Sequence, residues 1–158
     1  MTDSEKTYTA AECHKKMAAD LFNLTWELMD KPDRTPADDD RMVHAAHGSR
    51  FHWGEVGEPV NLQRGEWQVS RVYAVLKRPA PALFHAQRCL ALTEQHRLGG
   101  FDLAFAHEAM ARAYAIAGNE RQAARFMKQA RQATEKIEKK EDRDYVESEL
   151  RTIPGWGG

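Results

Sequence analysis

The hydrophobic residues of this chain recur at helical spacing along almost its whole length. Between residues 9 and 30 an apolar stripe runs through Met17, Leu21, Leu24 and Leu28, which share one face of a helix. No useful length of chain alternates between apolar and polar residues with the period of two that a half-buried strand requires. The pattern therefore predicts an all-α protein.

Prolines, glycines and capping residues separate the periodic segments. Thr35-Pro36-Ala37-Asp38 offers an N-cap, a proline at the first helical position and an acid three residues after the cap. Such signals predict seven helices, over about 9–30, 36–54, 59–77, the segment from Pro79–Pro81 to Gly99–Gly100, 102–117 (capped by Asp102 and ended by Gly118), 120–138 and 141–152. We expect one helical domain over 1–158, with flexible tails at 1–8 and 153–158, although Trp156 could instead dock onto the last helices.

The predicted core consists of the apolar and small residues on the inward faces of these helices. Helix 102–117 is apolar almost all round, so it should be the most buried element. The full predicted core is Leu21, Leu24, Leu62, Val69, Val72, Tyr73, Leu83, Leu90, Leu103, Met110, Tyr114, Ala123, Met127 and Ala130.

Two segments, 71–94 and 112–135, are copies of one another at an offset of 41 residues. The coincident pairs are Arg71/Arg112, Tyr73/Tyr114, Ala74/Ala115, Ala82/Ala123, Thr93/Thr134 and Glu94/Glu135. Similarity at a fixed period indicates stacked units, neither of which can bury its apolar face alone. The sequence therefore predicts a stack of antiparallel helix pairs, an α-solenoid.

The repeat carries a recognisable spacing of small and aromatic residues. The later copy has His107-x2-Met110-Ala111-x2-Tyr114 and then Ala123-x3-Met127, and the earlier copy has Glu66-x2-Val69-Ser70-x2-Tyr73 and then Ala82-x3-Ala86. This spacing resembles the tetratricopeptide pattern W-x2-L-G-x2-Y…A-x3-F, although the tryptophan and the terminal proline are missing and the period exceeds the usual 34 residues. The resemblance covers about 59–138, and a HEAT-type stack is the alternative. The whole chain is also similar to bacterial proteins of no assigned activity.

The resemblance implies that the first helix of each pair lines a concave groove for extended peptides. Carried over by position, the groove-facing residues are Arg64, Trp67, Arg71 and Ala74 on one helix and Phe105, Glu108, Arg112 and Ala115 on the other. Arginine and tryptophan are frequent at binding hot spots, and three arginines could hold a carboxylate through paired hydrogen bonds. We therefore expect partner binding at Arg64, Trp67, Arg71, Phe105, Glu108 and Arg112, with a protein or an acidic peptide as the partner. The family's carboxylate clamp of lysines and asparagines is not reproduced, so a C-terminal carboxylate ligand is not implied.

An alternative interpretation uses the same residues inside the chain. Arg71 and Arg112 would pair with Glu108 or Glu66, and Trp67 would pack against the first or the second helix. The groove would then be shallow or filled.

Three histidines, His44, His47 and His52, form a second candidate site because imidazole is a common transition-metal ligand. Helical spacing places His44 and His47 about 60° apart, but His52 lies about 140° from His47, so one straight helix cannot bring all three to one metal. A site would need a ligand from another helix, such as His14, Glu66 or His107. The competing interpretation makes these imidazoles half-buried polar anchors, bonded to carbonyl groups or to Glu55.

Charge and composition limit the function further. Residues 1–40 carry a net charge of −5 and residues 60–131 a net charge of +6, so the basic middle could attract an anionic partner or the chain's own acidic arm. A pI of about 6.7 gives no support to a nucleic-acid partner. Two cysteines without a CxxC pair, a polar N-terminus and no long apolar run predict a cytoplasmic protein that neither crosses nor binds a membrane.

The sequence has no nucleotide-binding glycine motif and no recognisable nucleophile–base signature, so we expect no cofactor and lean against an enzyme. The favoured function is a non-enzymatic binding or scaffold role, with homodimer formation through the first or last helix as a further expectation. A metal-binding protein or metal-dependent enzyme that uses the histidines is the alternative, and a small-molecule sensor with a pocket between the second, third and fifth helices is a third.

Overall fold

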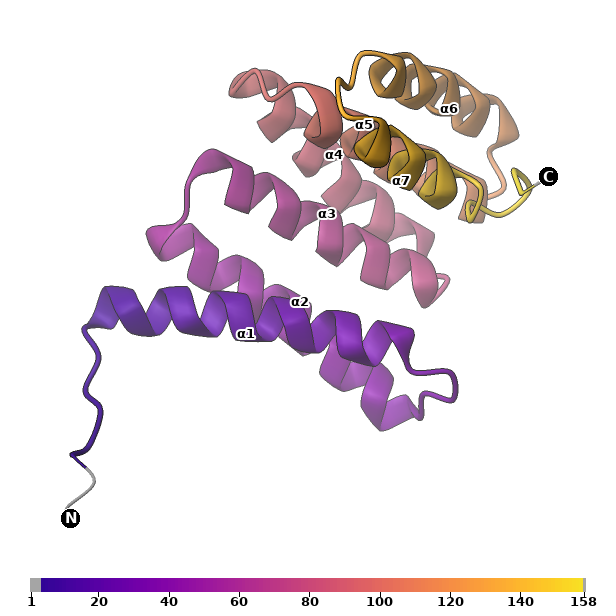
Figure 1. Ribbon diagram of the computed structural model, residues 1–158. Helices are drawn as coiled ribbons and strands as arrows, with labels where there is room; N and C mark the ends of the chain where they lie inside the picture. The colour runs from indigo at the N-terminus through magenta and orange to yellow at the C-terminus, as the bar shows by residue number, and fades with distance from the viewer. Residues whose placement is uncertain (1–3, 158) are drawn as a thin grey trace.

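The computed structural model describes residues 4–157, which form helices joined by short turns, with no strand in that range (Figure 1). The helices are α1 (Ala10–Asp30), α2 (Pro36–Val56), α3 (Pro59–Val75), α4 (Pro79–Gln95), α5 (Gly100–Ile116), α6 (Glu120–Glu135) and α7 (Lys140–Leu150). The all-α prediction of an antiparallel helix stack is confirmed. Residues 1–3 and 158 of the two predicted tails lie outside the described range.

Most helix starts follow from local capping chemistry. Thr9 and Thr35 each cap a helix, and each exchanges hydrogen bonds with an acidic residue three positions later. Proline occupies the first position of α2, α3 and α4, where its missing N–H leaves no hydrogen bond unmade. The predicted cap Asp102 is wrong: α5 begins at Gly100, and the Asp102 carboxylate accepts a hydrogen bond from Arg64 instead.

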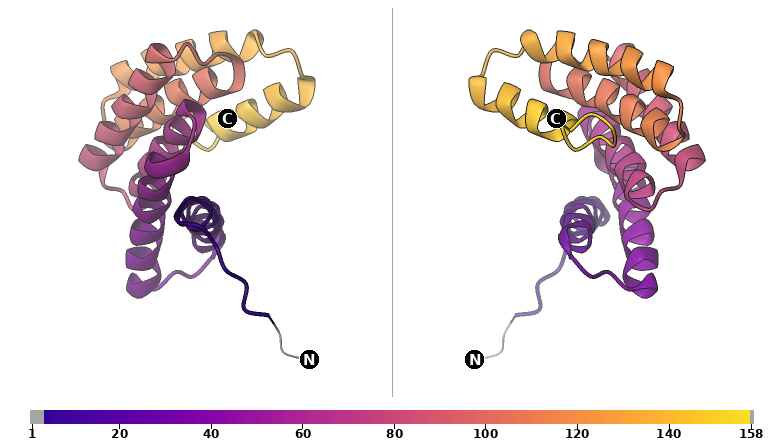
Figure 2. Two further views of the ribbon diagram at one scale, coloured as in Figure 1. Left: turned by 90° about the vertical axis from the view of Figure 1, so that its left-hand side faces the viewer. Right: turned by 90° about the vertical axis from the view of Figure 1, so that its right-hand side faces the viewer.

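Each helix packs beside the next in antiparallel pairs, α1 with α2, α3 with α4, and α5 with α6. The short α7 packs on α5 and α6. Figure 2 shows that α1 and α7 lie on the same side of the stack, at its two ends, and α3 and α5 come between them in the stacking order. This side is the face that the site occupies.

The two predicted copies make equivalent contacts. The ring of Tyr73 stacks on His85 with centroids 5.9 Å apart, and that of Tyr114 stacks on Phe126 at 5.7 Å. Both partners, like both tyrosines, are 41 positions apart. The copies also turn alike, because Lys77 and Gly118 follow the first helix of their pairs with left-handed φ angles of 57° and 78°. A tyrosine thus packs at the same junction in each hairpin.

The core forms two hydrophobic clusters, one across α3–α7 and a smaller one that joins α1, α2 and α3. Six predicted core residues are buried, namely Val69, Val72, Met110, Ala123, Met127 and Ala130, and the others are half-buried. Near the C-terminus Ile153 is buried and Trp156 packs against the main cluster. Within residues 4–157, every helix is too short or too polar to serve as a membrane span.

Candidate functional site

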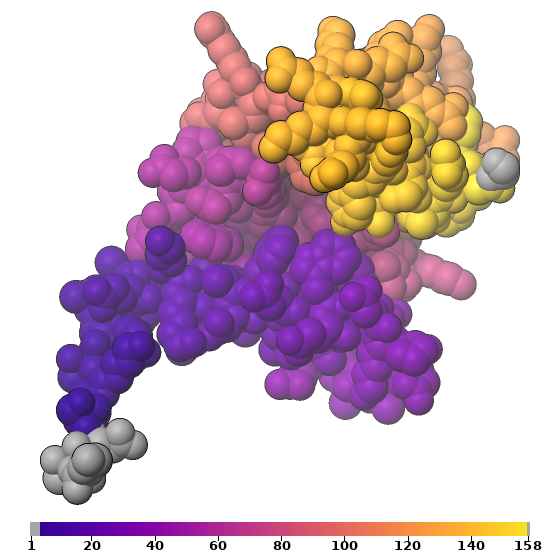
Figure 3. Space-filling view, in the orientation of Figure 1, coloured from indigo at the N-terminus to yellow at the C-terminus, as the bar shows by residue number. Residues whose placement is uncertain are grey.

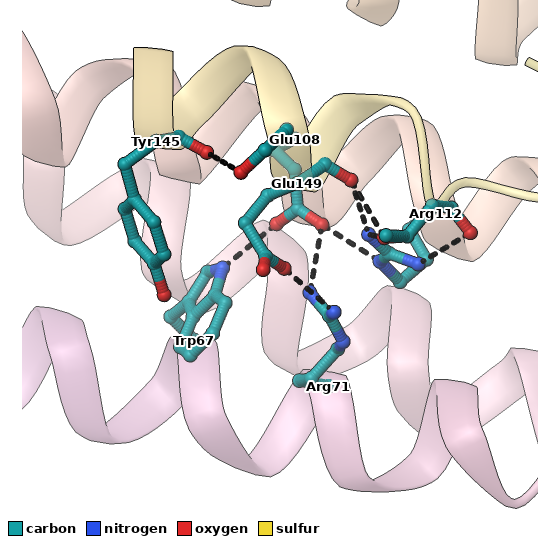
Figure 4. A network of polar contacts seen from close by, with 8 residues as sticks. Trp67, Arg71, Glu108, Arg112, Tyr145 and Glu149 are labelled. Atoms are coloured by element: carbon teal, nitrogen blue, oxygen red, sulfur yellow. Dashed lines mark hydrogen bonds and ion pairs between the residues drawn. The ribbon is translucent and has the colours of Figure 1, made fainter. Parts of the chain in front are cut away.

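A buried glutamate, Glu108, lies at the centre of a polar network on the face between α1 and α7 (Figure 4). Its carboxylate accepts hydrogen bonds from Nε1 of Trp67 at 2.8 Å, from Arg112 at 2.7 Å and from Arg71 at 3.2 Å. The Glu108 side chain is only 1% exposed, so its carboxylate has lost its contact with water. The three donors replace the hydrogen bonds that water would make. Charge-assisted hydrogen bonds of this kind are stronger than neutral ones.

The C-terminal helix closes this network. The other side of the Arg71 guanidinium donates to the Glu149 carboxylate at 2.7 Å, so Arg71 bridges α5 and α7. Arg112 donates to the backbone oxygens of Glu149 and Thr152 and to the Thr152 hydroxyl. Burial lowers the pKa of Arg112, and the charge of Glu108 opposes that effect. The end of α7 is thereby fixed to the helices that carry the predicted groove.

The contacts confirm the alternative interpretation of the predicted groove residues, in which they pair and pack inside the chain. Arg71 and Arg112 both pair with Glu108, and Trp67 packs against Trp26 on the first helix, with ring centroids 5.7 Å apart. The six residues of the predicted partner surface are therefore neighbours, but they divide into two groups. Arg71, Glu108 and Arg112 are held within the network, and Arg64, Trp67 and Phe105 line an open recess.

The recess has a volume of about 200 Å³ and lies between α1, α3, α5 and α7. Its walls are mainly aromatic: the lining residues are Phe22, Trp26, Gln63, Arg64, Trp67, Phe101, Asp102, Phe105 and Tyr145. The rings touch in series, since Trp67 meets Phe105 edge-on at 5.5 Å and Phe105 meets Phe101 at 4.7 Å. Four helices thus contribute one continuous aromatic wall.

The mouth of the recess carries a pair of opposite charges. Nε of Arg64 donates to the Asp102 carboxylate at 2.9 Å, and the Arg64 side chain is 53% exposed. Gln63, beneath this pair, donates its amide to the backbone oxygen of Asp102. Its own side-chain oxygen is buried and has no hydrogen-bond partner within the described chain. The recess therefore combines aromatic walls with a charge pair at its mouth whose two members already bind each other.

A second depression continues the recess along α1. It has a volume of about 230 Å³ and is lined by Ala19, Phe22, Asn23, Trp53, Asn61 and Arg64. Phe22 and Arg64 belong to both hollows, so the two are contiguous. Figure 3 views this side of the molecule, with α7 above and α1 below. Together the two hollows form a groove, called here the α1 groove, with the aromatic recess at one end.

The three histidines of the metal hypothesis turn to different partners. Nδ1 of His52 lies 2.9 Å from Nδ1 of His14, and Nε2 of His47 lies 2.8 Å from the Tyr73 hydroxyl. His44 is exposed. Across residues 4–157 no three histidine, cysteine, aspartate or glutamate side chains are placed to hold a metal ion. The competing interpretation named carbonyl groups or Glu55 as partners, and these two contacts go to other side chains instead.

Glu66, on the opposite side of α3, has its own cluster of partners. It accepts hydrogen bonds from Arg50 and Arg88, and its other oxygen lies 2.7 Å from Nδ1 of His85. Burial alone would raise the pKa of Glu66, but the bonds from His85 and Arg88 outweigh burial and lower the pKa. The cluster joins α2, α3 and α4 and does not touch the α1 groove.

Sequence reasoning missed most of the aromatic lining. Phe22 and Trp26 are four positions apart on α1, outside the apolar stripe that runs through Leu21, Leu24 and Leu28. Two aromatic residues on a face of the helix beside the apolar stripe were the signal that could have identified them. Phe101 lies at the start of α5 and Tyr145 in the middle of α7, and nothing local distinguishes them from ordinary packing residues.

Comparison with known proteins adds no further constraint. The chain matches no protein-family model, no curated protein and no solved structure. Its function has to be argued from the groove itself.

Proposed function

We propose that this protein is a non-enzymatic binding module of the tetratricopeptide-like type, which binds an extended segment of a partner protein along the α1 groove. One large side chain of that segment enters the aromatic recess, and the neighbouring residues lie along the hollow beside Ala19 and Asn61. The observation that carries the proposal is the continuity of the two hollows, which share Phe22 and Arg64.

Energetic considerations support a side chain as the occupant. Full burial of one large apolar or aromatic side chain is worth about 1.5–3 kcal/mol, enough to make one residue a hot spot. The recess volume of about 200 Å³ suits one such group rather than a folded surface. The flanking hollow and the exposed Arg64 would add weaker contacts around it.

The network also bears on the charge of the partner. Arg71 and Arg112 already bind carboxylates of the chain itself, and Arg64 binds Asp102. An acidic partner would have to compete with these internal pairs. A segment that brings a large side chain to the recess therefore fits the groove better than one that is recognised by acidic residues alone.

Selection from a library of random linear peptides tests the proposal. We expect enriched peptides to share one large side chain, and their affinity to fall about tenfold or more in Tyr145→Ala, as for a hot-spot contact. Phe84→Ala is the matched control, because Phe84 is an exposed aromatic residue on α4, outside the groove. The recess is not a peptide site if the enriched peptides bind both variants with the same affinity as the wild type. The same conclusion follows if the selection enriches no peptide.

A further inference from the structure

We infer that the aromatic recess receives an organic cation, and specifically an alkylated ammonium group carried on the side chain of a bound peptide. This inference rests on the proposed function, because it names the group that enters the same recess. Two properties of the recess lead to it, namely the kind of carbon surface and the supply of hydrogen-bond acceptors, and the balanced charges around the recess do not oppose it.

The carbon surface is aromatic and not aliphatic. Six of the nine lining residues are phenylalanine, tryptophan or tyrosine, and none is leucine, isoleucine, valine or methionine. An aliphatic group would gain as much from leucine walls, whereas a cation is attracted by the electron-rich faces of aromatic rings. The chain itself already uses this attraction at one wall, since the guanidinium of Arg71 lies 5.8 Å from the Trp67 ring centroid.

The charges around the recess are balanced by pairing. Beside the α7 wall, the carboxylates of Glu108 and Glu149 are paired with the guanidinium groups of Arg71 and Arg112. At the opposite rim the charge of Arg64 is balanced by Asp102, its hydrogen-bonded partner. Among the described residues, no unpaired positive charge therefore opposes a cationic ligand at the faces of the rings.

The acceptors decide between an alkylated and a plain ammonium. A lysine ammonium is strongly hydrated and has three N–H donors that need partners when it leaves water. Of the possible acceptors in the lining, the side-chain oxygen of Gln63 is buried, and the carboxylate of Asp102 already binds Arg64. A trimethylammonium group has no N–H donors and is weakly hydrated, so it loses less on entering an aromatic recess. We therefore expect trimethyllysine to bind better than lysine.

Calorimetry with an isosteric pair of probes tests the charge. Choline and 3,3-dimethylbutan-1-ol have the same shape, but only choline is charged. We expect choline to bind about 2- to 30-fold more tightly, the range that a cation–ring contact supplies. Equal binding of the two would overturn the inference and leave the peptide-binding proposal intact. If neither probe binds at millimolar concentration, the inference fails as well, and the peptide selection then judges the proposed function separately.

A peptide probe identifies the source of the cation. A short peptide with trimethyllysine should bind more tightly than free choline and than the same peptide with unmodified lysine, because the flanking residues also occupy the groove. Binding of choline without binding of the peptide would overturn the assignment to a peptide side chain.

Variants separate a role of the rings from a merely structural one. Trp26→Leu keeps an apolar wall but removes a ring face, so we expect it to weaken choline and leave dimethylbutanol almost unchanged. Tyr145→Leu, at a residue that is 45% exposed, repeats the test should the first variant fold poorly by circular dichroism. Phe84→Leu, outside the groove, should change neither affinity. An equal loss of both probes in the two recess variants would contradict the inference.

Discussion

Replacement of Glu108 by alanine should destabilise the protein more than any other single truncation of the polar network. Glu108 is fully buried and is the acceptor for Trp67, Arg71 and Arg112. Without it the Arg112 side chain, which is 8% exposed, loses its partner carboxylate, and Arg71 keeps only Glu149. Removal of one partner from a buried ion pair costs about 3–5 kcal/mol, because the remaining charge is left uncompensated.

The size of this effect can be measured by urea unfolding followed by far-ultraviolet circular dichroism. Since domains have a free energy of unfolding of about 5–15 kcal/mol, the expected loss is a large part of the total. In thermal unfolding it corresponds to a fall in Tm of about 10 °C for a chain of this size. The slope of the urea transition should stay unchanged, which would show that the folded structure is retained.

Two further variants serve as controls. Glu108→Gln keeps the shape and one acceptor, so we expect a loss between those of the wild type and the alanine variant. Glu149→Ala removes a carboxylate that is 20% exposed, and solvent can replace it at a cost of about 1 kcal/mol. If Glu108→Ala costs no more than Glu149→Ala, the network does not hold α7 and α5 together in the way described.

Three other predictions address different parts of the molecule. The pKa of Glu66 lies below its ordinary value of 4.5 in the folded protein. Its contribution to the free energy of unfolding is therefore complete above pH 4.5 and is lost as the pH falls through the folded pKa. Urea unfolding at about pH 3–7 should show a smaller loss of stability toward acid pH in Glu66→Gln than in the wild type. Gly65→Ala should lower the Tm, because a Cβ at this position would lie 2.8 Å from a side-chain carbon on α2. Gly99→Ala should change the Tm little, because a Cβ there meets nothing within 4 Å. Cys13 is exposed, while burial raises the pKa of the Cys89 thiol well above its usual value, so a thiol reagent should label one cysteine in the native protein and the second only in denaturant.

The helices were predictable because their signals are local. Apolar spacing and the sequence Thr35-Pro36 act within one or two turns, and the structure keeps both. The start of α5 was predicted incorrectly because the Asp102 side chain has a competing partner on α3, and a single segment does not reveal such competition. The core prediction named mostly large residues, whereas the structure also buries alanines such as Ala104 and Ala106 completely.

The site was predictable in part for the same reason. The repeat placed Trp67, Arg71, Glu108 and Arg112 on facing helices, and opposite charges at such positions pair. The recess depends on contacts between residues far apart in the chain, such as Arg71 and Glu149, which are 78 positions apart. The position of α7 over the face, and with it Tyr145 at the recess, follows from those distant contacts and not from any local pattern.

The hydrogen bond between Trp67 and Glu108 joins two residues that are 41 positions apart, so each bonds to its own counterpart in the neighbouring copy. A perfect duplication would set tryptophan against tryptophan or glutamate against glutamate at this contact, and neither pairing supplies both a donor and an acceptor. Glu149 lies another 41 positions after Glu108, so glutamate follows glutamate at this second step. Arg71 bridges the two carboxylates there. At this position successive segments are therefore joined in one of two ways, by unlike residues that bond directly or by an arginine between like residues.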